Sequence, residues 1–187
     1  MPDRRFAVAV HRLVDAGPDA TYRAIHAADL LGDRVVRGLF AARELPDRVV
    51  ARLRGEPLEP VPRRFTLDDV AALEGWTLLG EEPGVEIVLG SVGRFWERDY
   101  GWVEVPAEEW ATFAEPGYAK TVAGLSIRPY GDHRTLVSYE SRTTTTDEEA
   151  RRRFRRYWWL LRPFLGIVMS RALDAIRREA ESRRRPR

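Results

Sequence analysis

The stretch SYESRTTTTDEEARRRFRRYWWLLRPF, residues 138–164, decides how this chain is expected to fold. Its first residues continue a run with a period of two, which is typical of a β-strand. Thr146 followed by Glu149 has the spacing of a capping box, so a helix is expected to begin at about Asp147 and to reach about Ser182. The sequence therefore predicts a strand that leads directly into a long C-terminal helix.

The expected C-terminal helix has one apolar face. Its apolar side chains recur every three or four positions, and most of its arginines lie off that stripe. Pro163 removes a backbone donor and clashes with the preceding turn, so a kink is expected near residues 162–166. The pattern favours a helix whose apolar face covers the core and whose opposite face, which bears the arginines, is exposed to solvent. The stripe consists of Phe154, Tyr157, Trp158, Leu161, Leu165, Val168, Ala172 and Ile176.

Length and composition favour one soluble domain. With 187 residues, of which 44% are hydrophobic, the chain can build a core of its own over residues 1–182, and we expect residues 183–187 to be a disordered Arg-rich tail. Because the sequence has no cysteine, it excludes disulfides, thiolate zinc sites and cysteine nucleophiles. No signal segment opens the chain, and its apolar runs are too short to span a membrane. A cytoplasmic protein is expected.

The net charge of +2 is divided unevenly along the chain. Residues 151–187 contain 13 arginines and three acidic residues, so they carry +10 and leave −8 for the rest. A nucleic-acid-binding protein usually has basic residues on the body of its domain as well. Here the acidic body could instead pair with the basic segment. We therefore expect no nucleic-acid partner and at most weak peripheral contact with membranes, with Arg151, Arg152, Arg155 and the tail from Arg183 solvated.

The remaining segments are expected in the order of one strand, several helices and a run of antiparallel strands, which is typical of an α+β domain. Pro18 suits the first turn of a helix, Thr66 with Asp69 forms a cap pair, and Pro83 with Gly84 fits a type II turn. The expected strands are 6–14, 76–81, 85–97, 100–105, 118–130 and 134–146, and the expected helices before the last one are 18–32, 33–43, 46–54, 66–75 and 106–113.

These segments resemble the helix-grip fold of the START-related superfamily, often named SRPBCC, which includes lipid-transfer proteins, polyketide cyclases and aromatases, and coenzyme Q-binding proteins. The similar stretches are DAGPDATYRAI (15–25), LGSVGRFWE (89–97), EPGYAKTV (115–122) and residues 138–164, and the likeness extends over nearly the whole chain. The resemblance implies a curved antiparallel sheet wrapped around the long C-terminal helix, with an apolar cavity between them. Because residues 33–73 are longer and more helical than the connection usual in such folds, extra helices are expected between the first and second strands.

The sequence lacks the motifs of several kinds of catalytic site. His11, His26 and His133 do not have metal-ligand spacing, and no glycine-rich phosphate loop is present. Ser91 has Leu89 instead of glycine two positions before it, so the nucleophile-elbow pattern fails. The sequence therefore predicts no metal and no cofactor.

Candidate ligand-binding residues come from the last expected strand and from the aromatic side chains. If the face that bears Glu140 and Arg142 points into a cavity, the two could pair there and bind a polar ligand head. The alternative, which we favour, is an ordinary ion pair on the solvent side. The six tryptophans are more often core residues than ligand contacts. The pocket candidates are Tyr22, His26, Trp76, Leu89, Trp96, Trp102, Leu136, Ser138, Glu140, Arg142, Trp158 and Leu161.

Three functions are compatible with the sequence. The resemblance implies a non-catalytic carrier of a small hydrophobic molecule, such as a lipid, a polyketide or an isoprenoid-like compound. The second is a cyclase, aromatase or dehydratase in which Glu140, Arg142, Tyr139 and His26 would supply acid, base or enolate-stabilising groups. The third is contact of the Arg-rich helix with an anionic membrane or a nucleic acid. The sequence names neither the ligand nor the oligomeric state.

Overall fold

The structure is a computed structural model that describes residues 6–38, 41 and 64–182. A five-stranded antiparallel sheet with the strand order β1-β5-β4-β3-β2 forms its centre. The elements are β1 (Ala7–Val14), α1 (Pro18–Ala27), α3 (Leu67–Ala71), β2 (Trp76–Glu82), β3 (Glu86–Gly93), α4 (Ala107–Trp110), β4 (Ala119–Tyr130), β5 (Arg134–Thr145) and α5 (Glu148–Ser182).

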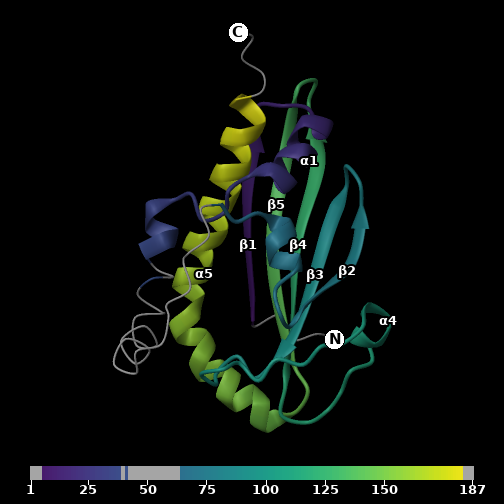
Figure 1. Ribbon diagram of the computed structural model, residues 1–187, viewed down its shortest axis with the longest axis vertical. Helices are drawn as coiled ribbons and strands as arrows, with labels where there is room; N and C mark the ends of the chain where they lie inside the picture. Colours follow the sequence, from purple (N-terminus) through teal and green to yellow (C-terminus); the bar gives the residue numbers. More distant parts are fainter. Residues whose placement is uncertain (1–5, 39–40, 42–63, 183–187) are drawn as a thin grey trace.

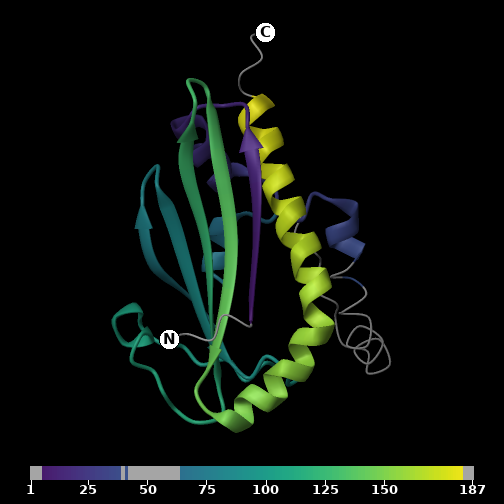
Figure 2. The same ribbon diagram turned by 180° about the vertical axis from the view of Figure 1, so that it is seen from behind.

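The helices α1, α3 and α5 lie on one face of the curved sheet, and α5 runs beside the edge strand β1 (Figure 1). The view from behind shows the opposite face of the long strands β4 and β5 (Figure 2). This arrangement confirms the predicted α+β helix-grip fold. Helical residues 34–38 and α3 confirm extra helices between the first two strands. The helix expected at 46–54 and the tail at 183–187 lie outside the described residues.

Alternate residues of β5 point to the two faces of the sheet. Val137 and Thr143 are buried on the face that the helices cover, whereas the side chain of Arg142 is 70% exposed beside the Glu140 carboxylate. The solvent-side ion pair is thus confirmed, and the alternative in which this set faces a cavity is wrong. Because side chains alternate along a strand, only one of the two sets on β5 can point into the core. The inward set is the one that contains Val137. The outward set is Leu136, Ser138, Glu140 and Arg142.

The described residues form two separate apolar clusters in the interior. The main cluster lies between the sheet, α1 and the second half of α5, and Val137, Leu173 and Ile176 are among its fully buried members. The aromatic cluster lies at the other end, where Phe154 of α5 meets the ring of Phe6 at 4.9 Å in an edge-to-face contact. The aromatic cluster consists of Phe6, Phe95, Ala119, Phe154 and Trp158.

Asp147 fixes the start of α5. Its carboxylate accepts hydrogen bonds from the N–H groups of Ala150, at 2.8 Å, and of Gly117, and these bonds hold its pKa below the ordinary value. The cap predicted from Thr146 is therefore wrong by one residue. The Thr146 hydroxyl is used elsewhere, because it donates to the Tyr118 carbonyl at 3.1 Å and accepts from the Tyr118 N–H at 3.0 Å.

The apolar stripe predicted for the C-terminal helix faces the core. Phe154, Trp158, Ala172 and Ile176 are buried, and the other members are half-buried. The helix contains Pro163 and changes direction along its course in both ribbon views, as expected for a residue without a backbone donor (Figures 1 and 2). Because of this bend, the first half of α5 lies at a different angle to the sheet from the second half.

Two expected elements differ from the structure. The helix expected at 18–32 ends at Ala27. The Asp29 carboxylate accepts hydrogen bonds from the N–H groups of Leu31 and Phe65, and these bonds stabilise a turn in place of further helix. The strand expected at 100–105 is reduced to a single bridge between Val103 and Val92. Positive φ angles of 60° and 46° at residues 100 and 101 turn the chain before a longer ladder can form.

Replacing Asp147 with alanine is expected to lower the free energy of unfolding by about 1–2 kcal/mol at neutral pH, because two N–H groups lose their acceptor. The lowered pKa means that this contribution is present above the ordinary carboxyl pKa and is lost as the pH falls through the folded value. Urea denaturation of the wild type and of Asp147→Ala should therefore give converging stabilities in acid. Glu148→Ala is the control, because the Glu148 side chain is 69% exposed and its carboxylate lies 3.5 Å from the Arg151 guanidinium of the same helix. If the free energies of unfolding of the wild type and Asp147→Ala differ by the same amount at neutral and at acid pH, Asp147 is not the cap of α5.

Candidate functional site

A groove of about 820 Å³ lies between β1 and the first half of α5. One wall is the start of the sheet, and the opposite wall is the helix around its bend. Apolar and aromatic side chains form most of the surface, and arginines from α5 are its charged members. The groove is lined by Phe6, Ala7, Val8, Ala9, Arg151, Arg155, Trp158, Trp159, Arg162, Pro163 and Gly166.

The groove exists because β1 is an edge strand and because α5 bends beside it. Among the described strands β1 pairs with β5 alone, and the Phe6 carbonyl accepts a hydrogen bond from the Thr143 N–H at 2.9 Å. In an antiparallel ladder the next residue turns its backbone groups the other way, so those of Ala7 and Ala9 point out of the sheet. On the helix, Gly166 has no side chain, and an added Cβ would meet no atom within 4 Å. The backbone groups of Ala7 and Ala9 therefore face the open space beside Gly166, and this space is part of the groove.

The groove carries positive charge that its surroundings neutralise only in part. Arg151 lies 3.5 Å from Glu148 of its own helix. Within the described part of the chain, Arg155 and Arg162 have no ion-pair partner. Among the described residues, the expected pairing of the basic segment with the acidic rest of the chain is present where Arg171 lies 3.7 Å from Asp33, and where Arg151, Arg152 and Arg153 contact Glu148 and Glu149 at the start of α5. An anionic group in the groove would thus find guanidinium donors that are not already occupied.

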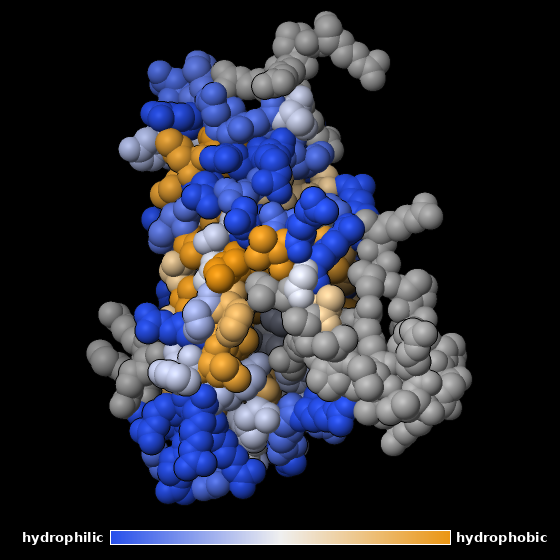
Figure 3. All heavy atoms as spheres, turned by 90° about the vertical axis from the view of Figure 1, so that its left-hand side faces the viewer, coloured by the Kyte–Doolittle hydropathy of each residue, from blue (hydrophilic) through white to orange (hydrophobic). Residues whose placement is uncertain are grey.

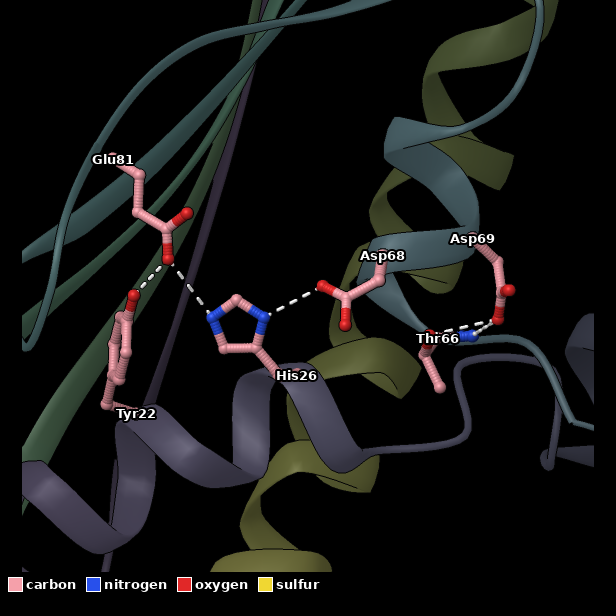
Figure 4. Close-up of polar contacts among 6 residues, drawn as sticks. All are labelled: Tyr22, His26, Thr66, Asp68, Asp69 and Glu81. Atoms are coloured by element: carbon pink, nitrogen blue, oxygen red, sulfur yellow. Dashed lines mark hydrogen bonds and ion pairs between the residues drawn. The ribbon is translucent and has the colours of Figure 1, made fainter.

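A polar cluster occupies a second place, where α1 meets α3 and β2 (Figure 4). Nδ1 of His26 lies 2.8 Å from the Asp68 carboxylate, and its Nε2 lies 3.3 Å from the Glu81 carboxylate. The Tyr22 hydroxyl donates to the same Glu81 carboxylate. Burial and the Glu81 carboxylate raise the pKa of Tyr22 to about 12. Glu81 was not predicted, because a β-bulge between Leu78 and Gly80 sets its direction.

This polar cluster is suited to holding elements together. Both ring nitrogens of His26 face a carboxylate, so neither points at open space where a substrate could lie. The three partners come from α1, α3 and β2, and their contacts connect these elements at the edge of the main cluster. A capping box between Thr66 and Asp69, as predicted, fixes the start of α3 beside them.

The structure does not assemble the enzyme constellation considered from the sequence. Glu140 and Arg142 lie on the outer face of the sheet, whereas Tyr139 points to the inner face, where burial raises the pKa of its phenol. His26 belongs to the polar cluster on α1. Among the described residues there is also no group of three or more His, Cys, Asp or Glu side chains that could hold a metal ion.

Of the twelve pocket candidates from the sequence, one lines the groove, namely Trp158. Trp76, Leu89 and Tyr22 belong to the main cluster or pack against it, and Trp96 and Trp102 pack against the aromatic cluster. Leu161 is half-buried on the sheet side of α5. The other candidates are His26 in the polar cluster and Leu136, Ser138, Glu140 and Arg142 on the outer face.

The other groove residues were not predicted as site residues from the sequence. Ala7 and Ala9 contribute through an open strand edge, and strand order cannot be read from the first strand alone. The sequence shows that Trp159 follows Trp158 directly, but it does not show which of the two is exposed. In the structure Trp159 is 83% exposed and Trp158 is buried. No helix among the described residues is long and apolar enough to cross a membrane.

No protein-family model matches the chain, and no curated protein matches it. Among solved structures, protein MLL2253 from Mesorhizobium loti is similar at 10% identity over 94% of this chain and 97% of that one, with a TM-score of 0.41. CalU16 from Micromonospora echinospora is similar at 16% identity over 92% and 72%, with a TM-score of 0.35. Norcoclaurine synthase from Thalictrum flavum is similar at 11% identity over 92% and 91%, with a TM-score of 0.40.

At such identities and TM-scores these similarities carry no information about a shared ligand or reaction. The strand order β1-β5-β4-β3-β2 and the packing of α5 beside β1 are properties of this chain itself. This topology is that of the helix-grip fold.

Proposed function

We propose that the protein binds a small amphiphilic molecule, with an apolar body and an anionic head, in the groove between β1 and α5. The observation that carries the proposal is the combination of a groove of about 820 Å³, walls of aromatic and aliphatic side chains, and two arginines, Arg155 and Arg162, that have no ion-pair partner among the described residues. Small-molecule sites typically enclose about 300–1,000 Å³ and pair apolar walls with a few polar groups.

Each part of such a molecule has a counterpart in the groove. An alkyl or ring body would contact Phe6, Val8 and Trp158, and burial of each methylene group contributes about 0.8 kcal/mol. A carboxylate head would accept from Arg155 or Arg162, and charge-assisted bonds of this kind are stronger than neutral ones. The ligand class expected from the sequence, a lipid, polyketide or isoprenoid-like molecule, is thus narrowed to members with an anionic group.

Gly166 offers a way to fill the groove without disturbing its walls. An added Cβ meets no atom within 4 Å, so a phenylalanine side chain can enter the space that a ligand would use. Gly166→Phe is expected to weaken dodecanoate binding by at least about tenfold, which corresponds to the loss of about two buried methylene contacts. Isothermal titration calorimetry with the purified protein measures this change.

Gly166→Ala is the matched control, because it adds a single methyl group and should leave dodecanoate binding unchanged. It should also stabilise the protein by up to about 1 kcal/mol, since glycine is a poor helix former. Dodecanol tests the anionic head, and it should bind more weakly than dodecanoate. Equal binding of dodecanoate by both Gly166 variants, or no binding by the wild type, would overturn the proposal.

A further inference from the structure

The first half of α5 has a second apolar stripe, on the side away from the sheet. Leu160, Phe164 and Ile167 follow one another at spacings of four and three, which places them on one line of the helix surface. They are 61%, 43% and 43% exposed. Trp159, at 83%, lies between this outer stripe and the groove, which it also lines.

Figure 3 looks onto this side of the molecule and shows apolar side chains gathered at mid-height between hydrophilic regions above and below. Single exposed apolar residues are common on protein surfaces and need no explanation. Four large apolar side chains within nine residues of one helix form a continuous patch, which marks a surface that meets another apolar phase. The periodicity that identified the core stripe does not account for them.

The residues around the outer stripe carry free positive charge. Arg155, Arg156 and Arg162 lie within one or two turns of it, and in the described part of the chain none of them has an ion-pair partner. Arg156 and Arg171 continue its line at the two ends, four positions from Leu160 and from Ile167. An apolar stripe bordered by arginines matches the chemistry of an anionic lipid surface, with acyl chains below and phosphate groups above.

We propose that this face of α5 docks on an anionic lipid bilayer and thereby places the mouth of the groove at the lipid surface. The docking surface consists of Trp159, Leu160, Phe164 and Ile167 with Arg155, Arg156 and Arg162. This inference rests on the proposed function, since Trp159 belongs to both the docking surface and the groove, so an amphiphile could pass between bilayer and groove without crossing water.

The geometry suits a helix that lies in the interface plane. Leucine, phenylalanine and isoleucine side chains would enter the acyl boundary, while tryptophan prefers the headgroup level. The guanidinium groups would remain among the phosphates, where anionic lipids attract them. Arg152 and Arg153 contribute less, because Glu149 lies 2.5 Å from one and 2.9 Å from the other.

Co-sedimentation with vesicles tests the proposal, with phosphatidylcholine alone compared to a mixture that contains phosphatidylglycerol. The wild type should pellet with the anionic vesicles at low salt and should be released as salt is added. A triple change of Leu160, Phe164 and Ile167 to serine should weaken this binding by at least about tenfold, because the apolar contacts are lost. Trp159 is left in place, so that the groove is unchanged.

Leu78→Ser with Val85→Ser is the matched control. These side chains are 45% and 43% exposed near β2, away from α5, and their loss should leave vesicle binding unchanged. The triple variant should still bind dodecanoate as the wild type does, so that loss of vesicle binding and loss of ligand binding are separate results. If the wild type does not bind anionic vesicles, or if light scattering shows a dimer that the triple change converts to a monomer, the proposal is overturned.

Discussion

Replacing Trp158 with alanine is expected to lower the free energy of unfolding by about 3–5 kcal/mol, the range for a large buried aromatic side chain. Trp158 is 7% exposed, stacks on Phe154 at 5.9 Å and meets Phe6 edge-to-face at the same distance. Its removal leaves an unfilled space beside Phe6 and Phe154 at the wall of the groove, because these rings are held by their own contacts and cannot collapse into it. Thermal and urea denaturation measure the loss.

The next residue along the chain is the control. Trp159 is 83% exposed, so Trp159→Ala should change the free energy of unfolding by no more than about 0.5 kcal/mol. The two substitutions delete the same side chain from the same helix, and they differ only in the direction in which it points. Similar stabilities of the two variants would show that the first half of α5 does not pack as described.

Replacing Gly75 with alanine is expected to destabilise the protein by at least about 2 kcal/mol, for two separate reasons. The residue has a φ of 77°, in the left-handed region that side chains rarely adopt. A Cβ built there lies 2.7–2.8 Å from ring atoms of Trp102, closer than real contacts allow. Trp102 stacks on Tyr100 at 4.8 Å and meets Phe95 edge-to-face, so its ring cannot move away freely.

Gly84 separates the two causes, because it has a similar φ of 79° and no atom within 4 Å of an added Cβ. Gly84→Ala should therefore cost only the left-handed conformation, about 1–2 kcal/mol. The difference between the two glycine variants, measured by urea denaturation, isolates the contact with Trp102. If Gly75→Ala is no more destabilising than Gly84→Ala, the close approach of the ring is wrong.

Much of the fold could be predicted because its signals are local and repeated. The apolar residues from Phe154 to Ile176 recur at helical spacing over about six turns, so the helix and its buried face follow from the sequence alone. The turn at Pro83 and Gly84 was predicted from two residues whose backbone preferences leave few alternatives, and its hydrogen bond from Val85 N–H to the Glu82 carbonyl is present at 2.9 Å.

The candidate site could not be predicted from the sequence, because the groove forms between β1 and α5, and the sequence does not show which elements lie side by side in the fold. The period of two along β5 is the same whichever face points inward, so it could not place Glu140. Asp147 and Thr146 are both good caps, and only the contact with Tyr118 assigns them different roles. The two tryptophans at 158 and 159 are alike in composition, and the exposure of one follows from where α5 lies on the sheet.

The separation of the interior into two clusters has a consequence for amide exchange. The first half of α5 is anchored by Phe154 and Trp158, the second by Leu173 and Ile176, and between them Pro163 leaves the Trp159 carbonyl without its usual helical donor. Local opening of the first half can therefore expose its amides to solvent while the second half stays protected. In these terms α5 consists of two segments joined at a proline, and the segment that forms a wall of the groove can open while the other stays closed.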